Sequence, residues 1–240
     1  MKHWTEVVKS CHMKGLEVDM RFRNIVWVAG ALGLACEQNP AAPSSAGATH
    51  TYDVVADFST TSNSDTSVWS YRYQIGFARD GNYLLLSGYG PDVIEQWTPI
   101  DPGAWRAQGY LPAIGVNATT SDDSIIGTGL TWPRGAMLVH PNYDGLVVLT
   151  WRSPSAAVVT VEFSFTSLHR VCGDGIDWFV EHNSDTATMG SGSLDPGGST
   201  GTRRLTGVRV QAGDRINFIV GPRAGYACDS TQLTATITTG

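Results

Sequence analysis

The sequence predicts an all-β protein, an antiparallel β-sandwich, and three observations support this fold class. Segments in which apolar and polar residues alternate recur at short intervals after residue 50. Turn-forming residues separate these segments, and the chain contains 27 Gly and 11 Pro among its 240 residues. No segment has a sustained helical period of apolar residues. Short alternating strands joined by tight turns are typical of two sheets that each bury one face.

Two stretches make the alternation explicit. In residues 159–165 the odd-numbered positions are apolar and the even-numbered ones polar. Along residues 176–181 the even-numbered side chains are expected to face the core, which makes Phe179 an exposed aromatic on a polar face. The predicted strands are residues 51–58, 69–77, 83–87, 136–140, 146–152, 157–165, 176–182, 205–210, 215–220 and 233–238. The aromatic side chains expected in the core are Trp151, Phe163, Phe165, Trp178 and Phe218.

Turn residues support the breaks between these strands. Asp144-Gly145 separates two predicted strands, and Gly213-Asp214 separates two others. Asp-Gly and Gly-Asp pairs adopt the backbone conformations that tight turns require. Each pair therefore predicts a β-hairpin.

The charge pattern excludes two classes of partner. The formal net charge is −6, and all three lysines (Lys2, Lys9 and Lys14) precede Met20. From Cys36 onward every cationic side chain is an arginine, and acidic residues outnumber them. An acidic surface with no basic stripe argues against nucleic acid and against electrostatic docking on anionic lipid.

Residues 1–35 are predicted to be a signal segment for export. Arg21 and Arg23 precede a short apolar run, residues 25–35. This run is shorter than the roughly 20 residues that a membrane-spanning helix needs, and it has the length of a signal peptide. Translation is predicted to start at Met20, because the residues before it fit neither a signal nor a domain.

The end of the apolar run, Leu32-Gly33-Leu34-Ala35-Cys36, resembles a bacterial lipobox. In a lipobox the cysteine is lipidated and becomes the first mature residue, so Cys36 is the predicted lipidation site. Residues 36–50 then form a Pro/Ser/Ala-rich tether, and residues 51–240 form the sandwich domain. We expect an outer-membrane or cell-surface lipoprotein that contacts the membrane only through this lipid. Ordinary signal cleavage, which gives a secreted protein, stays open.

Several short motifs occur in an order that is similar to a known class of domain. They resemble the carbohydrate-binding-module-like jelly-roll domains of exported bacterial surface proteins, over about residues 53–238. The resemblance implies a single jelly-roll sandwich that binds a polysaccharide or surface glycan. Modules of this class commonly accompany a catalytic domain, so a lone module implies display or capture. The motifs include Val68-Trp69-Ser70-Tyr71, Leu138-Val139-His140-Pro141, Leu149-Thr150-Trp151-Arg152-Ser153-Pro154 and Cys228-Asp229-Ser230-Thr231.

Cys172 and Cys228 are the only cysteines after Cys36. Export places them in an oxidising compartment, where paired cysteines form disulfides. We therefore predict a disulfide between them. The alternative is a metal site that includes His169, which precedes Cys172 in a His-x-x-Cys spacing.

Two aspartates adjoin this predicted disulfide, Asp174 and Asp229. The disulfide would bring both carboxylates to one rim of the sandwich, where calcium prefers carboxylate and carbonyl oxygens from irregular loops. The resemblance also implies a structural Ca²⁺ in such loops. Asp174 and Asp229 are therefore the predicted metal ligands, although Asp beside Gly is also ordinary turn chemistry.

Residues 88–134 contain aromatic side chains without a clear strand period, among them Trp132. Exposed aromatic rings stack on the apolar faces of sugar rings, and neighbouring polar groups bind the hydroxyls. The alternative is that this long connection folds over the core and uses its aromatics as anchors. The predicted glycan-binding residues are Trp97, Trp105, Tyr110, Asp101, Arg106 and Phe179.

The sequence contains no recognised catalytic motif such as Gly-x-Ser-x-Gly or His-Glu-x-x-His. A small glycosidase could use Glu162 with Glu181 on one solvent-facing surface. A polysaccharide lyase could use His140, Tyr143 and Arg152. A third possibility is a structural or adhesive surface protein. We expect a non-catalytic glycan-binding protein, and the sequence leaves the glycan and the oligomeric state open.

Overall fold

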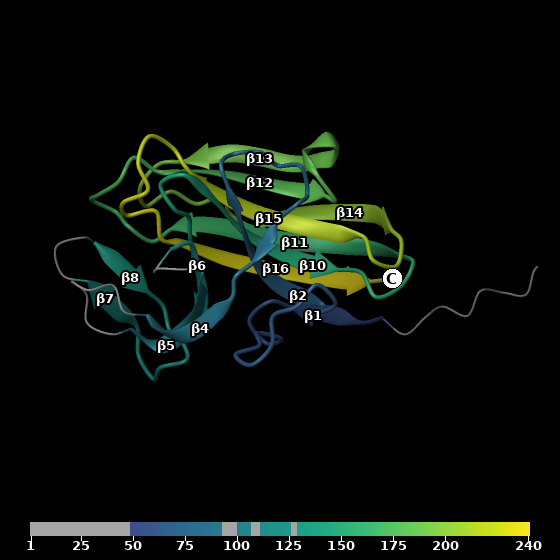
Figure 1. Ribbon diagram of the computed structural model, residues 1–240, viewed down its shortest axis with the longest axis horizontal. Helices are drawn as coiled ribbons and strands as arrows, with labels where there is room; N and C mark the ends of the chain where they lie inside the picture. The colour runs from purple at the N-terminus through teal and green to yellow at the C-terminus, as the bar shows by residue number, and fades with distance from the viewer. Residues whose placement is uncertain (1–48, 93–99, 107–110, 126–128) are drawn as a thin grey trace, which may run out of the picture. The chain divides into compact units, whose positions relative to one another are not determined.

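Two antiparallel sheets pack face to face in the computed structural model, which describes residues 49–92, 100–106, 111–125 and 129–240 (Figure 1). These residues belong to one compact unit, Ser45–Gly240. The predicted β-sandwich is confirmed. The eight-stranded sheet contains β1 (Thr51–Asp53), β4 (Gly88–Asp92), β5 (Ile100–Arg106), β6 (Ala113–Val116), β9 (Met137–His140), β11 (Ala157–Ser167), β14 (Arg203–Val210) and β16 (Thr231–Thr239). The six-stranded sheet contains β2 (Trp69–Ile75), β3 (Leu84–Leu85), β10 (Gly145–Arg152), β12 (Ile176–His182), β13 (Thr188–Leu194) and β15 (Arg215–Pro222).

The order of strands in each sheet places distant parts of the chain side by side. The eight-stranded sheet runs β14-β11-β16-β9-β6-β5-β4, with β1 paired to β16, and the six-stranded sheet runs β13-β12-β15-β10-β2-β3. A separate two-stranded sheet pairs β7 (Asp123–Ile125) with β8 (Leu130–Trp132). Strands β4, β5, β7 and β8 gather at one end of the sandwich (left in Figure 1). Within the described ranges the one helical element is the 3-10 turn η1 (Asp185–Ala187).

The core lies between the two sheets, where every second side chain of the long strands is buried. Along β12, Ile176, Trp178 and Val180 belong to this core, as the alternation predicts, and the odd-numbered residues face away from it. The same holds for β10 and β15, whose outward side chains lie on the far side of the six-stranded sheet. The five predicted core aromatics are confirmed: Trp151, Phe163, Phe165, Trp178 and Phe218 are 6% exposed or less.

Both predicted hairpins are wrong, although both turns exist. Asp144-Gly145 connects β9 of the eight-stranded sheet to β10 of the six-stranded sheet. Gly213, with a φ of +90°, lies in the turn from β14 to β15, which also joins different sheets. Turn residues set the local reversal of the chain, but the neighbour with which a strand pairs depends on the whole sheet.

Other predicted boundaries also change in the structure. The first strand ends at Asp53 and not at residue 58, because the Asp53 carboxylate accepts hydrogen bonds from the backbone N–H of Val55 and Ala56 and starts a turn. Strand β13 was not predicted, since its glycines and serines lack β-forming side chains. Its Gly192 lies against the Trp178 ring, where an added Cβ would be 3.1 Å from the ring atoms.

Candidate functional site

The outer face of the six-stranded sheet carries a buried carboxylate. Glu181 points away from the core along β12, yet it is 0% exposed because the connection from β2 to β3 crosses over it (Figure 1). In this connection Arg79 forms an ion pair with Glu181, and the Tyr83 hydroxyl donates to its Oε2 at 3.2 Å. Burial raises the pKa of Glu181, although the partners Arg79 and Tyr83 lower it in part. Glu181 thereby fixes the connection to the sheet.

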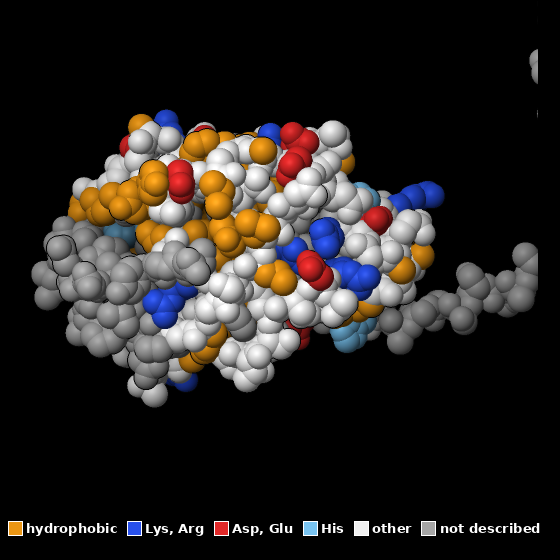
Figure 2. All heavy atoms as spheres, viewed as in Figure 1, with side chains coloured by type: hydrophobic (Ala, Val, Ile, Leu, Met, Phe, Trp, Pro, Cys, Tyr) orange, Lys and Arg blue, Asp and Glu red, His pale blue; other side chains and the backbone are white. Residues whose placement is uncertain are grey.

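A pocket of about 220 Å³ lies beside this anchored connection. Its aromatic side chains are Phe77, which is 58% exposed, and Phe179, whose ring centroid is 3.9 Å from the guanidinium carbon of Arg79. Gly221 lies at the bottom of the pocket and has no side chain to fill it. An added Cβ at Gly221 would be 2.7 Å from the Leu146 side chain. Figure 2 shows hydrophobic side chains gathered over this face. The lining residues are Phe77, Arg79, Leu146, Asp177, Phe179, Gly221, Pro222 and Arg223.

The polar groups of the pocket are held in place by neighbours. Asp177 Oδ1 accepts a hydrogen bond from the Ser193 hydroxyl at 2.5 Å. Arg223 Nη1 donates to the carbonyl oxygen of Asp174 at 2.9 Å and to Asp195 Oδ1 at 3.0 Å. A pocket with an exposed ring and fixed donors and acceptors can pack against the C–H face of a sugar and bind its hydroxyls.

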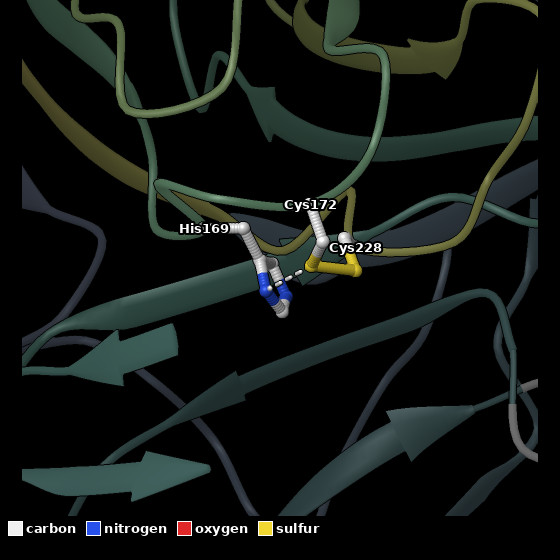
Figure 3. A group of neighbouring side chains, drawn as sticks. All are labelled: His169, Cys172 and Cys228. Carbon is white, nitrogen blue, oxygen red and sulfur yellow. Dashed lines mark hydrogen bonds between the residues drawn. A yellow bond between two sulfur atoms is a disulfide. The ribbon is translucent and has the colours of Figure 1, made fainter. Parts of the chain in front are cut away.

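The predicted disulfide between Cys172 and Cys228 is confirmed, with a Cα–Cα distance of 5.8 Å (Figure 3). His169 lies beside it, with Nδ1 3.3 Å from Cys172 Sγ and Nε2 3.2 Å from the Ser230 hydroxyl. The imidazole and the two sulfurs lie within 4.8 Å of one another. Because each sulfur is bonded to the other, neither is a thiolate, and the alternative metal site at His169 is wrong for this state of the protein.

The two predicted calcium ligands differ in their surroundings. Asp174 Oδ2 accepts hydrogen bonds from the backbone N–H of Ala224 at 2.6 Å and of Gly225 at 3.3 Å. Asp229 is 1% exposed, and neither oxygen has a hydrogen-bond partner among the described residues. Burial, and after it the charge of Asp174, raises the pKa of Asp229 to about 8. A buried carboxylate without partners is costly, and a cation beside Asp229 and Asp174 would offset this cost.

The predicted aromatic platform is only partly described. Trp97 and Tyr110 lie outside the described residues, and Asp101 and Trp105 lie on β5, where the structure describes only the backbone of these two residues. Arg106 ends β5 in the eight-stranded sheet and is partly buried. Phe179 lies on the other sheet. These binding assignments stay predictions.

Trp132, by contrast, anchors the long connection in which it lies. It is 1% exposed, and its indole N–H donates to the carbonyl oxygen of Ala136 at 2.9 Å.

The structure does not bring the proposed enzymatic groups together. Glu162 pairs with Arg204 on the outer face of the eight-stranded sheet, so it does not share a face with Glu181. Tyr143 is 66% exposed just before β10, whereas Arg152 is at the far end of this strand, which is about 23 Å long at 3.3 Å per residue. The glycosidase pair and the lyase trio of the sequence analysis are therefore wrong as sites.

Sequence reasoning missed Phe77, Arg79 and Arg223 as pocket residues. Phe77 was assigned to the end of a strand, and nothing in the local pattern indicates that the chain then folds back over β12. The partners that shape the pocket are far apart in sequence, as Arg79 and Glu181 illustrate with a separation of 102 residues.

Comparisons with known proteins identify structural likeness only. No protein-family model matches the chain, and the curated proteins contain no significant match. The solved structures that it resembles include carbohydrate-binding modules and also larger enzymes, such as an α-L-arabinofuranosidase and the enzymatically active domain of a bacteriophage tailspike protein. One is the CBM36-1 domain of a multidomain xylanase from the hindgut metagenome of Trinervitermes trinervoides, with 12% identity, 53% of this chain and 95% of that chain covered, and a TM-score of 0.31.

A second is TmCBM61 in complex with β-1,4-galactotriose, with 15% identity, 53% of this chain and 87% of that chain covered, and a TM-score of 0.31. A third is a family 35 carbohydrate-binding module from Clostridium thermocellum, with 10% identity, coverage of 50% and 87%, and a TM-score of 0.28. Likeness at this level assigns no ligand or ion to the protein. Separately, no helix among the described residues is long and apolar enough to cross a membrane.

The buried His140 predicts a pH dependence of stability. His140 is 4% exposed, and burial lowers its pKa to about 4, below the ordinary value of 6.5. Below pH 6.5 the unfolded chain binds a proton that the folded chain does not, so the free energy of unfolding falls as pH drops toward 4. This group alone is expected to contribute a loss of about 3 kcal/mol.

Urea denaturation at neutral and at acidic pH measures this loss. His140→Gln is expected to reduce the loss, whereas His50→Gln, at an exposed histidine, is expected to leave it unchanged. An equal loss in wild type and His140→Gln would contradict the assignment.

Proposed function

We propose that this protein is a non-catalytic glycan-binding module and that the pocket around Phe77 and Phe179 holds the sugar. The observation that carries the proposal is the combination, within about 220 Å³, of an exposed ring and fixed charged groups on one sheet face. Phe77 offers an apolar surface to the C–H face of a sugar ring. Asp177 can accept hydrogen bonds from sugar hydroxyls, and Arg223 can donate to them.

Binding without catalysis fits the state of the two carboxylates near the pocket. Asp177 is engaged by Ser193, and Glu181 is buried behind Arg79 and Tyr83. Hydrolysis of a glycosidic bond usually needs two carboxyl groups that reach opposite sides of the bond. Here Glu181 is occupied in holding the connection that forms one wall of the pocket.

A glycan array and pull-down with insoluble polysaccharides test this proposal on the whole chain. The wild type is expected to bind at least one glycan, and Phe77→Ala is expected to weaken binding about tenfold because the stacking surface is lost. Val158→Ala is a matched control, since Val158 is a 48% exposed apolar residue on the other sheet. Trp105→Ala tests the predicted platform on β5 in the same assay.

Two outcomes would overturn the proposal. If the wild type bound no glycan, the structural or adhesive class would account better for the protein. If Phe77→Ala bound as tightly as Val158→Ala and the wild type, the pocket would not be the glycan site.

We also propose that the rim beside the disulfide binds calcium through Asp229 and Asp174. The unpartnered, buried oxygens of Asp229 support a cation there, and oxygen ligands in irregular loops favour Ca²⁺. The role would be structural, because the ion would join the segment that follows Cys228 to the one that follows Cys172. The bound ion would supply positive charge that replaces the missing hydrogen bonds of Asp229.

Thermal unfolding with Ca²⁺ or with EGTA tests the calcium proposal. At about 100-fold excess over the dissociation constant, Ca²⁺ is expected to raise the unfolding midpoint by about 5 °C. Asp229→Asn is expected to abolish this shift, whereas Asp185→Asn, at an exposed aspartate, is expected to retain it. In EGTA, Asp229→Asn should be at least as stable as the wild type. A Ca²⁺ shift that survives in Asp229→Asn would exclude this site.

We propose further that Cys36 is lipidated and that residues 36–50 tether the domain to an outer membrane or cell surface. The apolar run that ends at Cys36 and the polar tether after it support this location. In a bacterial host, the wild type is expected to incorporate labelled palmitate and to sediment with membranes. Cys36→Ser is expected to do neither, and membrane attachment that persists in this variant would exclude the anchor.

A further inference from the structure

Three arginines lie together on the outer face of the six-stranded sheet, beyond the anchored connection. Arg152 and Arg215 are direct cross-strand partners at the ends of β10 and β15. Their neighbours Trp151 and Ile216 belong to the core, so the two arginines project to the outer face. Arg72 of β2 projects to the same face and is paired with Val148 of β10. We name Arg72, Arg152 and Arg215 the arginine cluster.

One carboxylate, Asp65, pairs with two of the three arginines. Asp65 Oδ1 is 2.7 Å from Arg72 Nη2 and 3.7 Å from Arg215 Nη2, and the Asp65 side chain is 65% exposed. The guanidinium of Arg152 makes no hydrogen bond or ion pair with another residue in the described part of the chain. The nearby acids are engaged elsewhere, since Glu181 pairs with Arg79 and Asp214 with His182. The cluster therefore keeps an excess of positive charge.

Arg72 is the fixed member of the cluster. It donates from Nε to the Ser70 hydroxyl at 2.8 Å and from Nη1 to the carbonyl oxygen of Tyr83 at 3.0 Å. Burial lowers its pKa, the hydrogen bond to Asp65 opposes this, and the charge of Arg215 adds to the lowering. The positive charges of Arg72 and Arg215 therefore repel each other, and this repulsion reduces stability unless an anion lies between them.

The arginine cluster concentrates positive charge on a protein whose formal net charge is −6. Figure 2 shows basic side chains grouped around acidic ones on the same face as the hydrophobic surface of the pocket. Like charges directly opposite each other on neighbouring strands cost stability unless a counter-charge joins them. Guanidinium groups bind carboxylate and sulfate oxygens with paired hydrogen bonds. A carboxylate or sulfate group would therefore supply the counter-charge that these arginines need.

We propose that Arg152 and Arg215, supported by Arg72, bind an anionic group of the glycan, so that the ligand is an acidic polysaccharide. This inference rests on the proposed glycan-binding function and adds the class of ligand. The pocket and the cluster lie on one face, at opposite ends of β15, which runs from Arg215 to Pro222. Seven residues of strand span about 23 Å. A polymer with carboxylate or sulfate groups reaches both, whereas a single sugar does not.

Affinity electrophoresis of the whole chain in gels that contain matched polymers tests the inference. Polygalacturonate is compared with its methyl-esterified form, and dextran sulfate with dextran. These pairs separate carboxylate from sulfate as the source of the negative charge. The wild type is expected to be retarded more by at least one anionic polymer than by its neutral partner, and the retardation should weaken from about 0.05 M to about 0.5 M NaCl.

Matched variants separate the cluster from net charge. Arg152→Gln with Arg215→Gln is expected to weaken binding of the anionic polymer about tenfold. Arg203→Gln with Arg209→Gln removes the same charge from exposed positions of β14 on the other sheet and is expected to have little effect. Asp65→Asn is expected to strengthen binding, because it removes the competing carboxylate. A structural role alone would not produce this gain.

Three results would overturn the inference. They are equal retardation by anionic and neutral polymers, equal loss in the two double variants, or no change in the Arg152 and Arg215 double variant. If Phe77→Ala weakened binding of a neutral glycan in any of these cases, the proposed function would stand and this inference alone would fail.

Discussion

Burial of every second side chain between the two sheets is the constraint on which the other features of this protein depend. Along β10, β12 and β15 the apolar partners of this core alternate with side chains that must project outward. The core therefore determines that Phe179, Arg152 and Arg215 appear on the same outer face. A shift of register by one residue would bury these groups and expose the core, so the composition of this outer face is as strongly fixed as the core itself.

The second constraint is the anchoring of the connection from β2 to β3 on Glu181. A carboxylate at a fully buried position is retained because Arg79 and Tyr83 satisfy both of its oxygens. This anchoring brings Phe77 and Arg79 to the face of β12 and turns a flat sheet into a pocket. It also separates the pocket from the arginine cluster, so that one extended ligand could contact both. The proposed binding face thus combines an aromatic surface at one end with positive charge at the other.

The rim beside the disulfide also contains a buried carboxylate, Asp229, but among the described residues this carboxylate lacks the kind of partners that Glu181 has. Asp174 uses backbone N–H groups to hold the segment that follows β15, and the disulfide joins this segment to the one before β12. Asp229, next to Cys228, is buried by this packing without acquiring partners. Glu181 and Asp229 are both buried carboxylates, but only Glu181 has its counter-charge within the described chain. This difference is the reason for proposing a cation at Asp229 and none at Glu181.

The sequence by itself determined the sandwich class, most long strands, the core aromatics and the disulfide. These follow from local rules: alternation with a period of two decides which side chains are buried, and two cysteines in an oxidising compartment form a disulfide. It also indicated Phe179 as an outward aromatic. Only the tertiary structure decided that the turns at Gly145 and Gly213 cross between sheets, that Phe77 and Arg79 fold over β12, and that Arg152 faces Arg215. Those features depend on which strands become neighbours, and that is set by packing between residues far apart in the chain and not by any local pattern.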